Sequence, residues 1–271
     1  MQGMHIASSS SNQSEVGLKR SLSLSLTTLY GLGNILGAGI YVLVGKVISH
    51  AGLFAPLSFL IASLLACLTA FTYAELSARY PLSAGEAVYV QQGLGIRAVS
   101  ALVGLLIIFA GMVSAATILR GFTGYLQVFV PVPEIAAILV LVVVLGGLAA
   151  WGITESVTVA AIITVLEIVG LLMIIAVATP DMLTGQGLPT DYSPLLESEA
   201  WYGIFAGGFL AFYAFIGFED MVNVAEEVRE PRRNLPRALL LSLAIASVLF
   251  FLVGLAAISS VPASLLADSD A

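Results

Sequence analysis

The sequence is poor in charge. Only 10% of its 271 residues are Asp, Glu, Lys or Arg, whereas soluble domains carry roughly 25%. Hydrophobic residues make up 59% of the chain, and its mean hydropathy is +1.03. A soluble domain is therefore excluded, and the composition indicates a polytopic membrane protein with the lipid bilayer as its solvent. The net charge of −7 gives no reason to expect a nucleic-acid partner.

Cysteine and histidine are almost absent. Cys67 is the single cysteine, so neither a disulfide framework nor a thiolate metal cluster can form. His5 and His50 lie far apart and lack metal-site spacing. No His-Glu-x-x-His motif, nucleophile elbow or phosphate-binding loop is present, which argues against an intramembrane enzyme. No metal or cofactor is expected, and the repeated filter motifs of channels are not seen.

Seven apolar stretches approach or exceed the roughly 20 residues that a helix needs to cross a bilayer. They cover residues 22–48, 53–76, 98–119, 133–150, 156–178, 201–224 and 238–260. Residues 86–94 are predicted to form a short amphipathic helix at the membrane surface. The Ser-rich residues 1–18 are expected to be a disordered tail, and the polar residues 179–200 a loop between spans.

The basic residues predict an orientation. If the N-terminus is cytoplasmic, only Lys46 and Arg120 fall outside. The other basic residues then all fall inside: Lys19, Arg20, Arg79, Arg97, Arg229, Arg232, Arg233 and Arg237. This bias follows the positive-inside rule. The N-terminal tail is therefore predicted to be cytoplasmic, the 179–200 loop extracellular, and the protein an integral protein of the plasma membrane.

Glycine interrupts the first span. Gly31, Gly33, Gly37 and Gly39 fall within nine positions, and glycine costs about 1 kcal/mol relative to alanine in a helix interior. A helix broken at membrane depth is tolerated only where its free peptide groups face protein or a wet cavity. Such a break offers N–H donors for a carboxylate and carbonyl acceptors for an ammonium group. The alternative is that these glycines form a helix-packing surface.

A second span carries the same kind of interruption. Residues 201–224 contain Gly207 and Gly208, and later Gly217, which is followed by Phe218, Glu219 and Asp220. Two interrupted spans in matching positions of two halves indicate a transport site between inverted repeats.

Three motifs resemble the amino acid–polyamine–organocation (APC) superfamily of permeases. They are Gly37-Ala38-Gly39-Ile40-Tyr41, the stretch from Tyr73 through Pro81 to Tyr89, and Phe215-Ile216-Gly217-Phe218-Glu219 with the charged loop that runs to Pro236. The resemblance covers residues 19–260. It implies an all-helical fold of the leucine-transporter type, in which five helices are followed by five more in inverted topology.

The resemblance also implies a division of the chain. Residues 19–178 would form the first five-helix repeat, and residues 201–271 the first two helices of an incomplete second repeat. Family members usually have about twelve helices, so this chain is truncated relative to them. It is a fragment, one part of a split transporter, or a chain that assembles with a second chain supplying the missing helices, and the sequence does not choose among these.

By the same resemblance, the N–H groups of Gly37, Ala38, Gly39 and Ile40 would hold a substrate carboxylate. The region of Phe215, Ile216, Gly217 and Phe218 would hold its amino group through backbone carbonyls. Phe215 and Phe218 are either aromatic gates over the substrate or residues that face lipid or core.

Two acids are candidates for proton coupling. Glu167 lies twelve residues after Glu155, about 18 Å along a helix and so near the bilayer centre. A carboxylate there is a functional hypothesis by default, the alternative being a neutral link between helices. Glu219 is the second candidate, whereas Asp220 is interpreted as a helix cap.

These features together predict a secondary active permease for an amino acid or related amine, coupled to protons. An exchanger without net ion coupling, or a non-transporting truncated or split-transporter subunit, is the alternative.

Overall fold

The computed structural model describes residues 20–185 and 187–261, and this part of the chain is almost entirely helical. Its elements are α1 (Leu24–Ala51), η1 (Gly52–Phe54), α2 (Ala55–Arg79), α3 (Gly85–Leu94), α4 (Arg97–Phe129), α5 (Glu134–Trp151), α6 (Ile153–Thr184), η2 (Ser193–Leu196), α7 (Ser198–Tyr213), η3 (Phe218–Glu227) and α8 (Pro231–Ser260), where η marks a 3₁₀ helix. The predicted all-helical class is confirmed. The tail predicted for residues 1–18 lies outside the described residues.

Six stretches of residues 20–185 and 187–261 are long and apolar enough to cross a membrane, where the sequence predicted seven. The difference arises in α1, whose backbone leaves helical geometry at Gly37 (φ −20°, ψ −160°). The part of α1 from Gly39 onward therefore joins α2 in one apolar stretch that ends at Arg79. The short helix predicted over residues 86–94 is present as α3, and α6 extends to Thr184, into the predicted loop.

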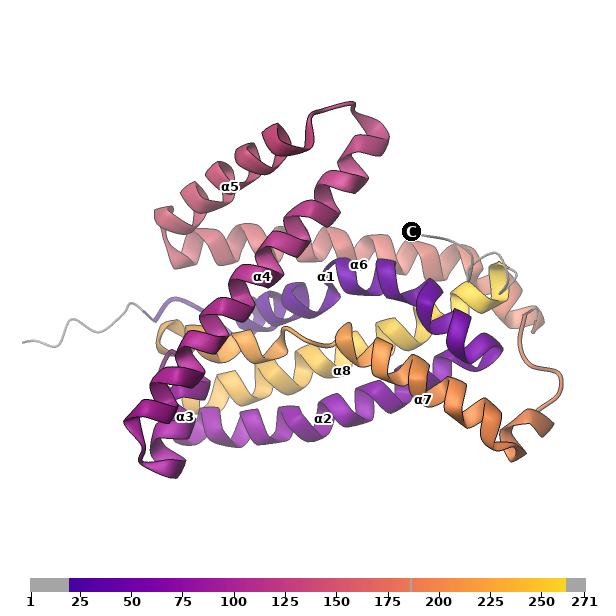
Figure 1. Ribbon diagram of the computed structural model, residues 1–271, viewed down its shortest axis with the longest axis horizontal. Coiled ribbons are helices and arrows are strands. Elements are labelled where there is room, and N and C mark those ends of the chain that lie inside the picture. Colours follow the sequence, from indigo (N-terminus) through magenta and orange to yellow (C-terminus); the bar gives the residue numbers. More distant parts are fainter. Residues whose placement is uncertain (1–19, 186, 262–271) are drawn as a thin grey trace, which may run out of the picture.

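Four helices form the core of the molecule. α1, α2, α7 and α8 pack against one another along the long axis (Figure 1). The buried face of α2 carries small residues, namely Ala55, Ala62, Ala66, Ala70 and Ala74. Such residues let helix backbones approach closely in a membrane, where packing rather than hydrophobicity drives association. Phe59 of α2 fills the remaining space against Phe250 of α8, with ring centroids 6.3 Å apart.

Two helices lie at the periphery. α4 crosses the bundle and α5 stands away from it, while α6 runs along the core beside α1 and α8 (Figure 1). Among the described residues, Thr123 is the one buried position of α4, and α5 has none. The exposed residues of both helices are mostly large and apolar, which suits contact with lipid because acyl chains are as apolar as Leu.

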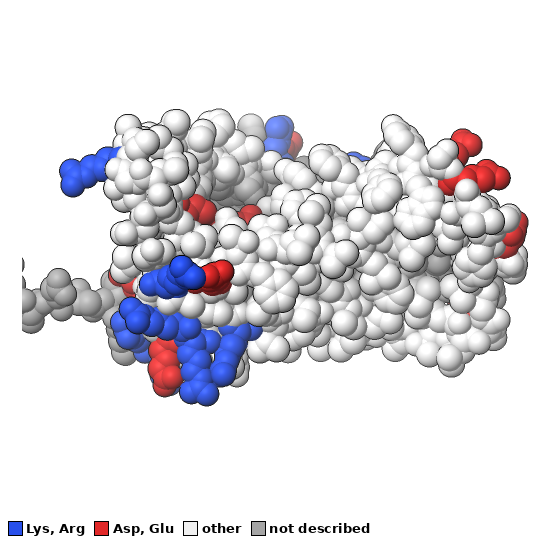
Figure 2. Space-filling model, turned by 90° about the horizontal axis from the view of Figure 1, so that it is seen from below, with Lys and Arg blue, Asp and Glu red and all other residues white. Residues whose placement is uncertain are grey.

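One end of the molecule gathers the basic residues. Leu22, just before α1, forms a parallel bridge with Val228, just after η3, so these distant segments lie side by side there. Arg20, Arg232 and Arg233 line one groove of about 390 Å³ at this end. Figure 2 shows Lys and Arg clustered at this end together with some acidic residues, whereas the visible charges at the opposite end are acidic. By the positive-inside rule this basic end is the one predicted to be cytoplasmic.

The orientation can be tested with topology reporters. We expect a reporter fused after residue 50 or residue 190 to be outside the membrane, and one fused after residue 82 or residue 231 to be inside, because the basic end should stay in the cytoplasm. Paired phosphatase and fluorescent-protein fusions measure both sides. The reverse pattern would contradict the orientation.

Candidate functional site

The first break divides α1 at Gly37. A change of backbone direction there interrupts the ladder of hydrogen bonds, so the half-helix that follows begins with N–H groups that lack partners within the helix. Among the described residues, no atom lies within 4 Å of the position that a β-carbon at Gly37 would occupy. Open space therefore adjoins the break. The structure describes the backbone of Ala38 but not its side chain.

The second break lies between α7, which ends at Tyr213, and η3, which begins at Phe218. Gly217 has φ 123°, a conformation that side-chain-bearing residues rarely adopt. The carbonyl groups of Phe215 and Ile216 accept no hydrogen bond within the described part of the chain. These two carbonyls are therefore available as acceptors, and their role in holding a substrate amino group stays a prediction.

The two breaks touch each other. A β-carbon at Gly39 would lie 3.2 Å from the Cα of Ala214, so the backbone of α1 after its break lies directly against the turn after α7. A β-carbon at Gly217 would come within 2.5 Å of the carbonyl oxygen of Asn34. The second break therefore also contacts the part of α1 that precedes the first break. The two breaks therefore lie against each other, within stretches that are apolar and long enough to cross a membrane.

The aromatic residues beside the second break lie in the core. Phe215 is completely buried, with its ring edge-on to Phe250 at 5.0 Å. Phe218 is 3% exposed and packs edge-on against Tyr73 at 5.7 Å. Of the two interpretations left open by the sequence, core packing describes both rings in this structure. Ile40 is also buried, whereas Ile216 is largely exposed.

Glu167 is half-buried on α6. Thr164, one turn earlier on the same face, lies against Gly33 of α1, so this face of α6 is directed toward α1. Glu167 is also within electrostatic range of Tyr41, which follows the first break. No hydrogen bond or ion pair to its carboxylate is found among the described residues. The carboxylate is therefore close to the first break and not fixed by a structural partner.

Glu219 has a definite structural role. Its Oε2 accepts a hydrogen bond from the Gly217 N–H at 2.8 Å, which closes the turn of the second break. Asp220, at the next position, is exposed and its side chain forms no hydrogen bond within the described residues. The predicted cap is thus Glu219 rather than Asp220, because only the first of the two reaches back to the turn.

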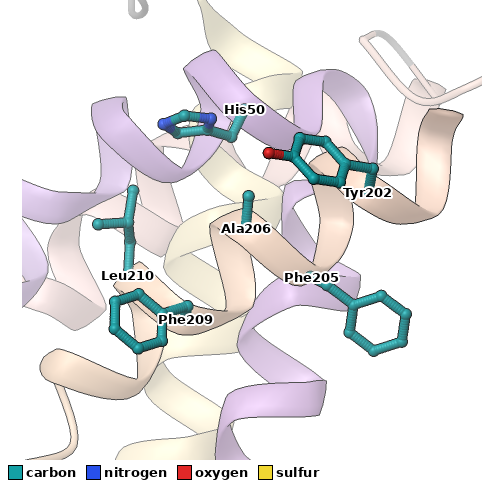
Figure 3. Close-up of a pocket in the computed structure, with 6 residues that line it drawn as sticks. All are labelled: His50, Tyr202, Phe205, Ala206, Phe209 and Leu210. Atoms are coloured by element: carbon teal, nitrogen blue, oxygen red, sulfur yellow. The ribbon is translucent and has the colours of Figure 1, made fainter.

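A groove of about 480 Å³ lies elsewhere, between the end of α1 and α7. Figure 3 shows its lining: His50, Tyr202, Phe205, Ala206, Phe209 and Leu210. Apart from His50 and the Tyr202 hydroxyl, the lining is apolar, so the groove lacks the paired donors and acceptors that a zwitterion needs. We therefore place the candidate site at the breaks.

Sequence reasoning missed two residues near the breaks. Ala214 contacts the backbone of Gly39, and Thr164 places α6 beside Gly33 of α1. Gly39 and Gly217 could have indicated a close backbone approach from the sequence alone. Their contact partners could not be identified because they lie more than a hundred residues away in the chain.

Two interrupted membrane helices that pack against each other are a feature of a class of helical membrane proteins, the secondary transporters. Comparison with known proteins specifies the family: a family model described as "Amino acid permease" matches residues 17–270. The chain belongs to this APC-type amino acid permease family, as its motifs predicted, and is not an enzyme.

Individual relatives agree with this assignment. The chain is 34% identical to the Arabidopsis thaliana cationic amino acid transporter 2, vacuolar, over 90% of its own length and 41% of the relative's. It is 30% identical to the branched-chain amino acid permease BcaP of Bacillus subtilis, over 88% of its length and 54% of the relative's. The chain therefore spans about half the length of the curated relatives that it matches.

The contact between the breaks can be tested at Gly217. Gly217→Ala should lower stability by roughly 1–3 kcal/mol, because the φ of 123° is strained for alanine and the new β-carbon meets the Asn34 carbonyl. Gly95→Ala is the matched control, since Gly95 also has a positive φ (70°) but nothing within 4 Å. Thermal unfolding in detergent measures both. Equal losses would show that the Asn34 contact contributes nothing.

Proposed function

We propose that this chain carries the substrate site of an amino acid transporter, formed where the two breaks meet. The backbone N–H groups of Ala38, Gly39 and Ile40 bind the substrate carboxylate, and the carbonyls of Phe215 and Ile216 bind its amino group. The observation that carries the proposal is the contact of Gly39 with Ala214, which brings donors and acceptors together beside the open space at Gly37. A half-helix N-terminus favours an anion.

The proposed substrate is an α-amino acid recognised through its main-chain groups. Relatives are named for cationic and for branched-chain amino acids, and a backbone-formed site is compatible with both because it binds only what they share. The substrate side chain would then extend into the open space beside Gly37.

Transport is proposed to be coupled to protons through Glu167 and Glu219. Glu167 is a half-buried carboxylate without a hydrogen-bond or ion-pair partner among the described residues, and it faces the helix that contains the first break. Glu219 is bonded to the second break itself. A change of charge at either acid would alter the site directly. Exchange without net coupling is the alternative that the Glu167 experiment distinguishes.

The remaining features of the proposal concern the whole transporter. Residues 19–178 would be the first repeat and residues 201–271 the start of the second, with residues 179–200 outside and the N-terminus in the cytoplasm of the cell. Because the chain covers only 41% to 54% of these relatives, a second chain supplying further helices is a proposed partner. A subunit that does not transport alone is the corresponding second candidate.

Gly37 and Gly39 should respond differently to substitution. Gly37→Leu should leave membrane insertion intact and weaken amino acid binding by about tenfold or more, which is roughly 1.4 kcal/mol, because leucine fills the open space. Gly39→Leu should instead reduce the folded yield, because its side chain meets the Ala214 backbone. Ligand-induced shifts of thermal stability measure binding.

Gly146→Leu is the matched control for Gly37→Leu. Gly146 lies in a membrane helix, is exposed, and also has nothing within 4 Å. Amino acid binding that survives Gly37→Leu unchanged would contradict the proposed site.

Glu167→Gln tests coupling. Glutamine keeps the shape but cannot ionise, so uptake driven by a pH gradient should fail while exchange of substrate continues. Glu155→Gln, in the first turn of the same helix, is the control. Proteoliposomes that contain this chain and any second-half partner provide the assay. We expect this chain alone to insert without uphill transport. Normal gradient-driven uptake by Glu167→Gln would make Glu167 a structural residue.

A further inference from the structure

Three segments meet around Glu86, at the end of the molecule where α2 ends. The Tyr73 hydroxyl of α2 donates a hydrogen bond to Glu86 Oε1 of α3 at 3.2 Å. The Tyr73 ring packs edge-on against Tyr89 of α3, at 6.4 Å, and against Phe218 of η3, at 5.7 Å. Gly85 lies directly against Val222 of η3, so α3 and η3 are in close contact.

Two polar atoms in this region are buried without a partner. Glu86 Oε2 and the Tyr89 hydroxyl make no hydrogen bond with any described residue. Tyr89 is only 8% exposed, and residues 86 and 89 lie one turn apart on the same face of α3. Buried polar groups are nearly always hydrogen-bonded, so two exceptions one turn apart on α3 require a physical explanation.

The charges of the region are unbalanced. Glu219 and Asp220 of η3 are within electrostatic range of Glu86, so negative charges of α3 and η3 repel one another across this contact. Tyr73 from α2 and Tyr89 from α3 are the other titratable groups that face Glu86. Among the described residues, the ion pairs are Arg79 with Glu75 and Arg120 with Glu134, so no base neutralises this group.

Burial raises the pKa of Glu86, the negative charge of Asp220 raises it further, and the Tyr73 hydrogen bond opposes the shift. Burial also raises the pKa of Tyr89, which stays a neutral phenol. Protonation of Glu86 would remove one of the negative charges that repel across α3 and η3, and it would give the unpartnered Oε2 a hydrogen to donate.

We propose that Glu86 is a proton-binding site, occupied while α3 packs against η3 and vacated when the two separate. This goes beyond the proposed function, because it concerns a group outside the substrate site and can be tested without transport. A proton fits better than a metal ion, because the described residues contain no group of three or more acidic, His or Cys side chains spaced to hold a metal.

The expected pH dependence follows from the direction of the shift. The packed state binds the proton more tightly than the separated state, so packing is fully stabilised below the ordinary pKa of a glutamic acid. That stabilisation is lost as pH rises through the raised pKa of the packed state. Each unit of difference between the two pKa values changes the packing equilibrium about tenfold.

A cysteine reporter measures this packing. Ser83 directly precedes α3, its Oγ is buried, and its N–H donates to Glu226 Oε1 at 3.2 Å, so Ser83→Cys places a thiol in the contact. The reporter is introduced into a Cys67→Ala background, which leaves no other cysteine. Labelling rates with a maleimide are divided by the rate of the unfolded chain at the same pH, which removes the titration of the thiol itself.

With Glu86 present, we expect relative labelling to rise severalfold between pH 5 and pH 8, because the packed state loses its proton as pH rises through the raised pKa of Glu86. Glu86→Gln should stay protected throughout, because glutamine mimics the protonated acid. Glu75→Gln, an exposed acid of α2, should keep the rise. A flat profile with Glu86 present, or the same rise in Glu86→Gln, would overturn the proposal.

Hydrogen exchange provides a second test that needs no substitution. Residues 85–94 should lose protection between pH 5 and pH 8 after correction for the intrinsic rate, while the buried part of α8 should not. Equal protection at both values would overturn the proposal even if Glu86→Gln failed to fold. Recovery of protection at pH 8 on adding sodium would also overturn it, since the site would then hold a cation.

Discussion

The arrangement of this molecule depends on one constraint: a peptide group at membrane depth must be hydrogen-bonded or shielded from lipid. By itself, a helix broken at Gly37 would leave peptide groups without hydrogen bonds. The turn that ends at Gly217 would do the same. The two segments satisfy the constraint together, because Gly39 lies against Ala214 and Gly217 against the Asn34 carbonyl. The core helices around them shield the remaining groups, so the close contact of α1, α2, α7 and α8 follows from the breaks.

The glycines of α1 have different physical roles, although they look equivalent in the sequence. Gly33 and Gly39 are sites of close approach, where a side chain would meet Thr164 or Ala214. Both positions contribute to helix packing, and Gly39 also provides one of the N–H groups of the proposed site. Gly37 combines a non-helical backbone with open space on its free side, so packing does not account for it. A polar site needs both kinds, since one holds the segments together and the other leaves room between them.

The sequence predicted the helical class, most of the spans and both breaks, because hydropathy and glycine content report these directly. It did not predict what depends on distant partners. Phe215 is buried because Phe250, 35 residues later, packs edge-on against its ring. The helix containing Glu86 was recognised, but not the burial of that acid, which arises where α3 meets Tyr73 and η3. Hydropathy would place such a glutamate in water.

α3 lies between the peripheral helix α4 and the segment η3, and it contacts both. Ser100 of α4 donates a hydrogen bond to the Ala87 carbonyl of α3 at 2.7 Å, and α3 in turn contacts η3, which follows the second break. A displacement of that break would therefore act on α4 through η3 and α3. Coupling between the second break and α4 requires an element that can adopt two arrangements. The contact between α3 and η3 is the proposed element, because a change of one charge there would separate α3 from η3. Glu86 lies at that contact, so its protonation state would decide whether movement at the break is passed to the helices that face the lipid.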